Sequence, residues 1–282
     1  MRAFGQSQGV KRREDLRFLT GTGRYLADIL PDGALHAVFL RAPVAHAVIE
    51  RIDTADAAQM PGVALVLTAD DLRAAGVTEG LWAVTARDRR GIKGRVTRRP
   101  ILAEGVLRHV GEPVALVVAE TRAQALDAAE AITFDLTERP AHLALRPGGP
   151  LVHDDVAENQ PVDWHLGDTE AVTAAFARAA HVTTLSVRQN RVAVVSLEPR
   201  AAFAEWDGTR LHFAFNGQGV WTHKRELARV LNLTPEDVRV TSPDVGGGFG
   251  MKTTLYPEQF AVAQAARMLG QPVAWIADRA ES

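Results

Sequence analysis

The strongest constraint on this chain is a glycine-rich stretch, DVGGGFGMK, at residues 244–252. It has four glycines within five positions, after a predicted strand at 238–242 and before a predicted helix that begins near Pro257. Glycines let the backbone turn tightly and approach a bound group closely. A glycine-rich connection from strand to helix can also direct several N–H groups at one acceptor, as in many anion and cofactor sites.

Two common nucleotide motifs do not match this stretch. A dinucleotide fingerprint requires G-x-G-x-x-G, whereas Gly246, Gly248 and Gly250 are spaced as G-x-G-x-G. A phosphate loop requires Gly-Lys followed by Ser or Thr, and here Met251 separates Gly250 from Lys252. Nucleotide binding is therefore disfavoured, and a plain tight turn stays open as an alternative at this point.

A second glycine-containing turn precedes it. The segment NGQGVW at 216–221 leaves a predicted strand at 211–215 and enters a predicted helix at 222–231. A Thr-Pro-Glu-Asp turn follows at 234–237, with the threonine as cap and the proline in the first helical position. This order, ending in the GGGFG stretch, resembles the large, molybdenum-binding subunit of the xanthine oxidase family. Aerobic carbon monoxide dehydrogenases, aldehyde oxidoreductases and bacterial N-heterocycle hydroxylases belong to that family.

The resemblance extends over nearly the whole chain. Further segments match the family in the same order: RED at 13–15, RFLTG at 17–21, RAPVAHA at 41–47, VGEPVA at 110–115, WHLGD at 164–168, LEPR at 197–200, YPE at 256–258 and PVAW at 272–275. Each segment is weak alone, but the ordered set is specific. It implies an α+β fold, in which an α/β hammerhead domain is followed by an incomplete first molybdopterin-binding domain.

Composition and periodicity divide the chain in the same way. We expect four parts: an N-terminal arm at 1–17, the hammerhead domain at 18–137, a proline- and glycine-rich linker at 138–163, and the first molybdenum-binding domain, truncated, at 164–282. Apolar runs predict strands at 35–40, 63–67, 114–119, 182–187 and 201–205. Capping residues and apolar spacing predict helices at 122–131 and 170–179, and Asp207-Gly208 predicts a hairpin turn.

The residue content limits the chemistry that this chain can supply. It contains no cysteine, which excludes disulfides, zinc–thiolate sites and iron–sulfur clusters on this chain. Its nine histidines are scattered without a metal-binding spacing, so we expect no metal bound directly by side chains. If the protein carries out redox chemistry, its electrons must leave through another polypeptide.

Charge and hydropathy disfavour two classes of partner. The net charge of −2 argues against a nucleic-acid or membrane surface, and no apolar stretch approaches the length of about 18 residues that a membrane span needs. The first ten residues lack a secretory apolar region, so we expect a cytoplasmic protein. A basic run at 87–99 could bind an acidic partner or nucleic acid. Because no aromatic residues interleave with it, a solvated, mobile loop is the preferred interpretation.

The resemblance assigns a cofactor and the residues near it. It implies a molybdenum–pterin cofactor, either molybdopterin or its cytosine dinucleotide, that performs a hydroxylation with water as the oxygen source. Gln218 matches a family glutamine that donates a hydrogen bond to a molybdenum oxygen ligand, a role suited to an uncharged amide. The cofactor-binding set implied by the family is Gln218, Gly219, Gly248, Phe249 and Gly250. No flavin or iron–sulfur cluster is expected on this chain.

Thr253 is implied to lie close to the substrate. Purine-oxidising members have a glutamate at this position that grips the substrate ring, and Thr253 has no charge to do so. Xanthine is therefore disfavoured as a substrate. The loop is more similar to those of enzymes that oxidise carbon monoxide, aldehydes or N-heterocycles.

The family subunit is much longer than this chain. By resemblance, the missing part contains most pterin contacts and the catalytic glutamate, so no catalytic residue is assigned here, and Glu198 and Glu258 are interpreted as structural. We expect a C-terminal molybdenum-subunit polypeptide, an iron–sulfur small subunit and an FAD-binding medium subunit as partners. A non-catalytic remnant or scaffold is the alternative. An incomplete domain should also leave an unburied apolar face around 216–282.

Overall fold

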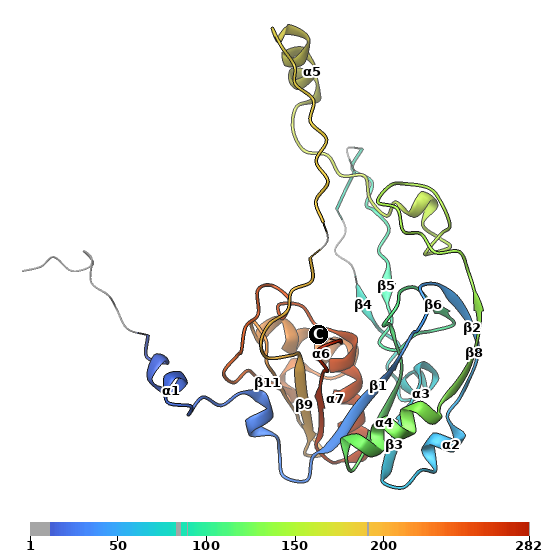
Figure 1. Ribbon diagram of the computed structural model, residues 1–282, viewed down its shortest axis with the longest axis vertical. Helices are drawn as coiled ribbons and strands as arrows, with labels where there is room; N and C mark the ends of the chain where they lie inside the picture. Colours follow the sequence, from blue (N-terminus) through green and yellow to red (C-terminus); the bar gives the residue numbers. More distant parts are fainter. Residues whose placement is uncertain (1–11, 83–85, 89, 191, 282) are drawn as a thin grey trace, which may run out of the picture.

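One large sheet organises the molecule. The computed structural model describes residues 12–281 except 83–85, 89 and 191. In this described part, seven strands form a sheet in the order β11-β10-β9-β12-β1-β7-β3 (Figure 1). Their bounds are Val238–Thr241 (β11), Leu211–Phe215 (β10), Ala201–Trp206 (β9), Val273–Ile276 (β12), Leu35–Arg41 (β1), Pro113–Ala119 (β7) and Val63–Leu67 (β3).

The two halves of the chain share this sheet. Strand β12 lies between β9 and β1, and it pairs in parallel with β1 so that Leu35 is opposite Val273. The rings of Phe39 on β1 and Trp275 on β12 meet edge to face at 5.7 Å. Main-chain hydrogen bonds and one apolar core therefore join the regions expected to be the hammerhead and molybdenum-binding domains. The boundary between these domains stays a prediction.

Helices cover both faces of the sheet. All seven residues of β7 are buried because helices pack against both of its sides. Leu116 and Val118 face a core that includes α6 and α7, whereas Val117 packs with alanines of α4. The helices are α2 (Ala55–Ala58), α4 (Arg122–Ala131), α6 (Trp221–Val230) and α7 (Pro257–Leu269). This double coverage explains the uninterrupted apolar run of β7 in the sequence.

Smaller elements complete the described fold. A three-stranded sheet has the order β6-β2-β8, and a separate ribbon pairs β4 with β5. Their bounds are Val106–Leu107 (β6), Ala47–Asp53 (β2), Thr133–Glu138 (β8), Leu81–Trp82 (β4) and Arg98–Arg99 (β5). The remaining helices are α1 (Asp15–Leu19), α3 (Ala69–Ala74) and α5 (Thr169–Arg178), with short 3-10 turns at η1 (Leu26–Ile29), η2 (Ala157–Asn159) and η3 (Pro235–Asp237).

Most elements predicted from the sequence are present, but one strand is not. The strand predicted at 182–187 is wrong, because these residues are extended, exposed and without a strand partner in the described part of the chain. Alternating apolar residues indicate an extended backbone, but a strand also requires a neighbouring row of hydrogen-bonding groups. The basic run is also more ordered than predicted at one end, where Arg98 and Arg99 form β5; Arg89 lies outside the described residues.

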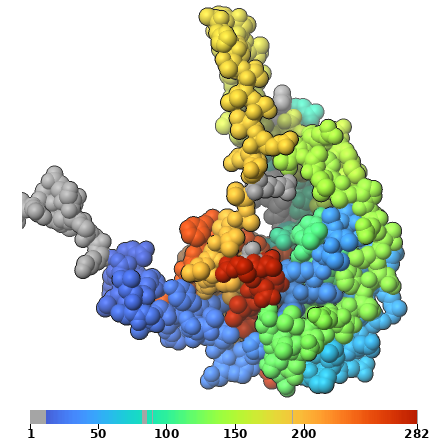
Figure 2. All heavy atoms as spheres, in the orientation of Figure 1, coloured from blue at the N-terminus to red at the C-terminus, as the bar shows by residue number. Residues whose placement is uncertain are grey.

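Residues 164–195, which we name the arm, project away from the rest of the molecule (Figures 1 and 2). They hold α5 and many exposed large apolar side chains: Trp164, Leu166, Val172, Phe176, Val182, Leu185, Val187, Val192, Val194 and Val195. Within 216–282, where an apolar face is predicted, Trp221, Phe249, Met268 and Ile276 are exposed. Most of β12 and α7 is buried within the large sheet and its covering core, so the arm exposes more apolar side chains than this region does.

The described residues include no helix that is both long enough and apolar enough to cross a membrane.

Candidate functional site

Two loops meet at one edge of the large sheet. Gln218 lies between β10 and α6, and the glycine-rich stretch 244–252, named the GGGFG loop, lies between β11 and α7. Strands β10 and β11 are parallel neighbours, with Phe213 opposite Val240. Because the carboxyl ends of parallel strands lie at the same edge, the loops that follow them are neighbours. The sheet thus brings together two motifs that are about thirty residues apart in sequence.

The side chain of Gln218 is held by the GGGFG loop through its oxygen. Oε1 accepts hydrogen bonds from the Gly250 N–H at 3.0 Å and the Thr253 hydroxyl at 3.2 Å. The main-chain N–H of Gln218 donates to the Lys252 carbonyl at 3.0 Å. Among the described residues, the Gln218 Nε2 group has no hydrogen-bond partner. The amide therefore presents a pre-positioned, neutral donor on an exposed surface.

Gly248 lies directly beneath Gln218. A Cβ atom at Gly248 would be 2.4 Å from Gln218 Cδ, so any side chain there would displace the amide. Gly250 differs, because it has open space around it but a φ of +89°, which L side chains rarely adopt. Gly219 is also open, with a φ of +129°. Gly219 and Gly250 thus leave open space beside the loop, whereas Gly248 allows the Gln218 side chain to pack against it.

Phe249 is the least constrained member of the predicted set. It has a φ of +49°, and its side chain is 76% exposed. Its ring extends back over Gly247, where a Cβ would be 2.9 Å from Phe249 Cε2. The structure thus connects Gln218, Gly248, Gly250 and Thr253 directly, whereas Gly219 and Phe249 flank them on the open side.

A buried ion pair holds the GGGFG loop from below. Lys252 is 3% exposed, and its Nζ donates to Glu198 Oε2 at 3.2 Å. The same oxygen accepts the Gly246 N–H at 2.7 Å, and Oε1 accepts the Leu26 N–H at 3.4 Å. Burial lowers the pKa of Lys252, and the negative charge of Glu198 opposes that change. Glu198 thus ties three segments to one carboxylate.

The beginning of the loop is attached to the N-terminal region. The Arg17 guanidinium of α1 forms an ion pair with Asp244, and the Arg24 N–H donates to Asp244 Oδ2 at 2.9 Å. These hydrogen bonds, with the one from Arg17 as the larger effect, lower the pKa of Asp244. The N-terminal segment predicted at 1–17 is therefore attached to the site through its last residue, Arg17. Residues 1–11 lie outside the described part.

Two buried side chains support the Gln218 turn from behind. Asn216 accepts the Ala201 N–H at 2.9 Å and donates to the Pro199 carbonyl at 2.6 Å. His223, in the first turn of α6, is 1% exposed and stacks on Phe215 with ring centroids 4.0 Å apart. Burial lowers the pKa of His223 to about 4, against a smaller opposing effect of the nearby backbone. This imidazole is therefore neutral near pH 7.

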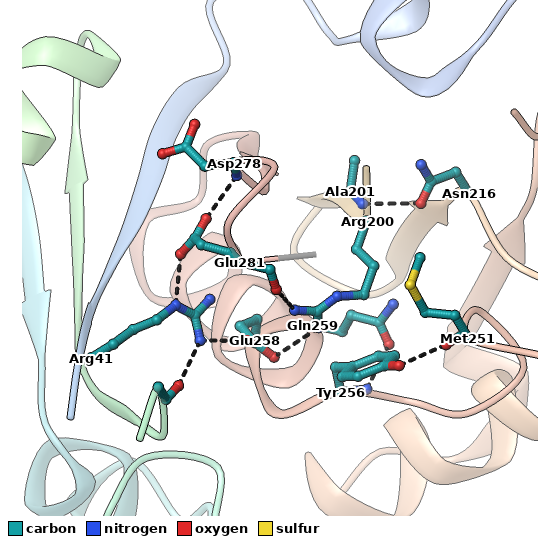
Figure 3. A network of polar contacts seen from close by, with 11 residues as sticks. Arg41, Arg200, Ala201, Asn216, Met251, Tyr256, Glu258, Gln259, Asp278 and Glu281 are labelled. Atoms are coloured by element: carbon teal, nitrogen blue, oxygen red, sulfur yellow. Dashed lines mark hydrogen bonds and ion pairs between the residues drawn. The ribbon is translucent and has the colours of Figure 1, made fainter. Parts of the chain in front are cut away.

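A polar network links the end of the loop to β1 (Figure 3). Glu258, 2% exposed at the start of α7, accepts a 2.8 Å hydrogen bond from Arg41 Nη1 and lies 3.6 Å from Arg200 Nη1. Arg200 stacks over the Tyr256 ring at 4.0 Å, and the Tyr256 hydroxyl donates to the Met251 carbonyl at 2.7 Å. These contacts support the interpretation of Glu258 as structural, because its buried carboxylate is bound by Arg41 and lies close to Arg200.

A cavity of about 890 Å³ lies beside Thr253. Its lining comes from β4, β5, the segment before β7, the expected linker, α6 and the residues that follow the GGGFG loop: Leu81, Thr97, Arg98, Arg99, Pro100, Arg108, His109, Glu112, Val152, His153, Thr222, Glu226, Arg229, Thr253, Thr254 and Leu255. Its volume is within the range of small-molecule sites. In the described residues, no group of three or more His, Asp or Glu side chains is placed to hold a metal ion.

Sequence reasoning missed the supports beneath the site. Glu198 was interpreted only as structural, and neither Lys252 nor Asp244 was assigned a contact. The sequence offers only the position of Lys252 at the end of a glycine-rich loop, because its need for a carboxylate follows from the burial that the structure shows. Which carboxylate serves is decided by tertiary contacts, since Glu198 is more than fifty residues away in the chain.

Comparisons with known proteins place both halves of the chain in known domain families. Residues 20–140 match the aldehyde oxidase and xanthine dehydrogenase a/b hammerhead domain, and residues 152–282 match the molybdopterin cofactor-binding domain. The chain belongs to the molybdenum-binding large-subunit family of xanthine oxidase and aerobic carbon monoxide dehydrogenase. The family's characteristic cofactor is a molybdenum–pterin group.

Several relatives are molybdenum hydroxylases. The chain is 39% identical to the nicotine 6-hydroxylase large subunit of Paenarthrobacter nicotinovorans over 97% of this chain and 33% of that protein. It is 32% identical to the carbon monoxide dehydrogenase large chain of Hydrogenophaga pseudoflava, covering 96% and 34%. The fold is similar to quinoline 2-oxidoreductase from Pseudomonas putida 86, with a TM-score of 0.84, 36% identity and coverage of 96% and 34%. The chain thus spans about a third of the length of these relatives.

Proposed function

We propose that this chain forms the N-terminal part of the large subunit of a molybdenum hydroxylase. The reaction would hydroxylate an aldehyde, an N-heterocycle or a similar small molecule, or oxidise carbon monoxide, with water as the oxygen source. The observation that carries the proposal is the Gln218 amide, whose Oε1 is bound by Gly250 and Thr253 while Nε2 has no partner in the described residues. Family membership supplies the cofactor class.

The residues present fit a molybdenum–pterin group. Gly219 and Gly250 leave open space where side chains would project, and Gly248 lets the Gln218 amide lie against the loop. When bound, the cofactor supplies the two-electron redox chemistry. Gln218 Nε2 would donate a hydrogen bond to an oxygen ligand of the cofactor, and Phe249 with Gly250 would line its site. Thr253 would lie beside the substrate in the adjoining cavity.

Completion of the site requires further polypeptides in this proposal. Relatives are about three times as long as this chain, and we infer that the remaining large-subunit polypeptide supplies most pterin contacts and the catalytic base. The apolar side chains of the arm are a surface that such a polypeptide would cover. An iron–sulfur small subunit and an FAD-binding medium subunit would then accept the electrons, in the cytoplasm.

The test is reconstitution with a polypeptide that corresponds to the remaining two thirds of the large subunit. The complex should contain molybdenum, whereas the chain alone should not. Gln218→Ala should retain molybdenum but slow reduction of the cofactor by substrate about 100- to 1,000-fold, as loss of one well-placed donor does elsewhere. Gln59→Ala, at an exposed position of another segment, is the matched control.

The alternative, a non-catalytic remnant or scaffold, predicts a different result. In that case the complex would assemble without molybdenum, or would hold molybdenum without reduction by any aldehyde or N-heterocycle tested. Gln218→Ala with a rate within about twofold of wild type would show that Gln218 is only a turn residue.

A further inference from the structure

The lining of the cavity beside Thr253 combines apolar and basic side chains. Leu81, Pro100, Val152 and Leu255 contribute apolar surface, which is the larger share of its lining. Four arginines line the same space: Arg98, Arg99, Arg108 and Arg229. The chain as a whole carries a net charge of −2, so this basic lining is a local feature. The basic lining includes Arg98 and Arg99 from the basic run at 87–99, which has no role in the proposed reaction.

Two of these arginines are neutralised within the chain. Arg98 forms a forked ion pair with Glu104, at 2.6 and 2.9 Å. Arg229 contacts Glu226 at 2.7 Å and Glu79 at 3.1 Å. Their charges are therefore balanced, and their geometry is fixed by these partners. Neither is available for a bound anion without giving up a carboxylate.

The other two are not neutralised. In the described part of the chain, neither Arg99 nor Arg108 has a carboxylate within ion-pair distance. Arg108 donates from Nη1 only to the Val106 carbonyl at 3.2 Å, and its buried Nε has no partner. A buried guanidinium nitrogen without an acceptor is costly, which shows that contacts within the chain do not satisfy this group. The accessible part of the guanidinium therefore favours an incoming anion. The planar fork of arginine suits the two oxygens of a carboxylate.

The remaining ionisable groups cancel only part of this charge, because the lining has two carboxylates, Glu112 and Glu226, against four guanidinium groups. Glu112 has a 5% exposed side chain, and its Oε2 accepts the Arg108 main-chain N–H at 2.6 Å and lies 3.7 Å from His109 Nδ1. Burial lowers the pKa of His109, the charge of Glu112 opposes this, and Arg99 adds a smaller lowering effect. Burial and then Arg108 lower the pKa of His153. Both shifts favour the neutral imidazole, so in this part of the cavity two guanidinium groups, Arg99 and Arg108, stand against the single carboxylate of Glu112.

We propose that this cavity binds a small aromatic or heteroaromatic carboxylate, with Arg99 and Arg108 as its anion contacts and Thr253 at the side that adjoins Gln218. The substrate class of the proposed hydroxylase is then an organic acid. This step rests on the proposed function for the oxidation, but the binding of the anion does not. The volume of about 890 Å³ accommodates a one- or two-ring acid.

Binding can be measured on the 282-residue chain without molybdenum. Benzoate and benzamide share a ring and differ in charge, and calorimetry or NMR titration would compare them. Benzoate should bind at least about tenfold more tightly, since a charge-assisted hydrogen bond contributes that factor or more. Arg99→Gln and Arg108→Gln should each remove about tenfold of benzoate affinity, and Arg108→Lys should restore part of it. Arg239→Gln, an exposed arginine on β11, should change nothing.

Several results would overturn the proposal. Equal binding of benzoate and benzamide, or binding of neither up to millimolar concentration, would exclude a carboxylate site. Unchanged benzoate affinity in both folded glutamine variants, as judged by thermal unfolding, would remove the two arginines from it. Inorganic phosphate that displaces benzoate with higher affinity would assign the site to phosphate instead. The assay is independent of cofactor loading, so a reconstituted complex without molybdenum would refute the proposed function and leave anion binding intact.

Discussion

The GGGFG loop and the arm lie in the same predicted domain and are held in opposite ways. The loop is fixed at its beginning by Arg17, at its centre by Gln218 and from below by Glu198. The arm has a capped helix, in which Asp168 accepts the Ala171 N–H at 2.9 Å, but its large apolar side chains are exposed. The chain therefore holds the loop in place by its own contacts, whereas the described part of the chain leaves the apolar groups of the arm uncovered.

The physical difference lies in the source of the stabilising contacts. The loop begins where β11 ends, beside the parallel strand β10. Strand pairing therefore fixes the position of its backbone, in addition to the contacts of its side chains. Residues 180–195 are extended in the described part of the chain but have no strand beside them. An isolated extended segment gains no hydrogen bonds to offset its conformational entropy. The contrast predicts large effects of substitution in the loop and small ones in the arm.

The largest effect is expected at Glu198. Glu198→Ala would leave Lys252 as an uncompensated buried charge, and the free energy of unfolding should fall by roughly 3–5 kcal/mol. Chemical denaturation would measure it. The matched control is Glu205→Ala. The Glu205 side chain, which pairs with His212, is 38% exposed, so its loss should lower the free energy of unfolding by less than about 1 kcal/mol. In Glu198→Ala/Lys252→Met, the loss should be smaller than in the single Glu198 variant, and equal losses would contradict a buried pair.

His223 should give stability a pH dependence below pH 6.5. Its pKa is about 4 in the folded chain and near 6.5 when unfolded, so the unfolded state binds more protons between these values. Stability from the neutral imidazole is thus complete above pH 6.5 and is lost as the pH falls towards 4, by about 3 kcal/mol. His223→Phe keeps an aromatic ring against Phe215 and should flatten this part of the curve. Identical pH profiles for the two proteins would show that His223 is not buried in solution.

Alanine substitutions at Gly248 and Gly250 test two different constraints on the loop, close packing at the first position and backbone strain at the second. In Gly248→Ala, the new Cβ would be 2.4 Å from Gln218 Cδ, so overpacking should cost about 1–3 kcal/mol and displace the amide. Gly250→Ala meets open space, and only its φ of +89° opposes it, at about 1 kcal/mol. Thermal unfolding of both variants would rank them. A more stable Gly248 variant than Gly250 variant would contradict the packing of Gln218 on Gly248.

The smallest effect is expected in the arm. Phe176 on α5 is 62% exposed, so Phe176→Ser should change the free energy of unfolding by less than about 0.5 kcal/mol. Limited proteolysis of the chain should cut first within residues 180–195, where backbone hydrogen bonding is sparse. Two results would contradict this prediction: a fall of more than about 2 kcal/mol in the free energy of unfolding of Phe176→Ser, or resistance of residues 180–195 to protease in the chain alone. Either would show that the arm packs against the rest of the molecule.

Reconstitution with the remaining large-subunit polypeptide would test the difference between the arm and the GGGFG loop in the complex. With the remaining large-subunit polypeptide present, the arm should become resistant to protease, and Phe176→Ser should weaken assembly. The stability of the loop should change less, because its supports lie within this chain.

By itself, the sequence determined the local features of this protein and its family. Glycines at 246–250, the capping residues of α4 and the apolar run of β7 act within a few residues, so they can be recognised without a fold. Ordered motifs identified the family because their spacing is preserved across the chain. Gln218 and Thr253 could be predicted as neighbours of one site only through that resemblance, since nothing local connects them.

The tertiary structure decided which distant groups meet. It placed β12 between β9 and β1, selected Glu198 as the partner of Lys252, and left Val182, Leu185 and Val187 without a neighbouring strand. It also neutralised Arg98 with Glu104 while leaving Arg99 without a carboxylate in the described residues. Periodicity records which face of an element is apolar, but a pairing depends on strand order and on long-range contacts. Those follow from the packing of the whole chain, because each pair is stabilised only once both elements are in place.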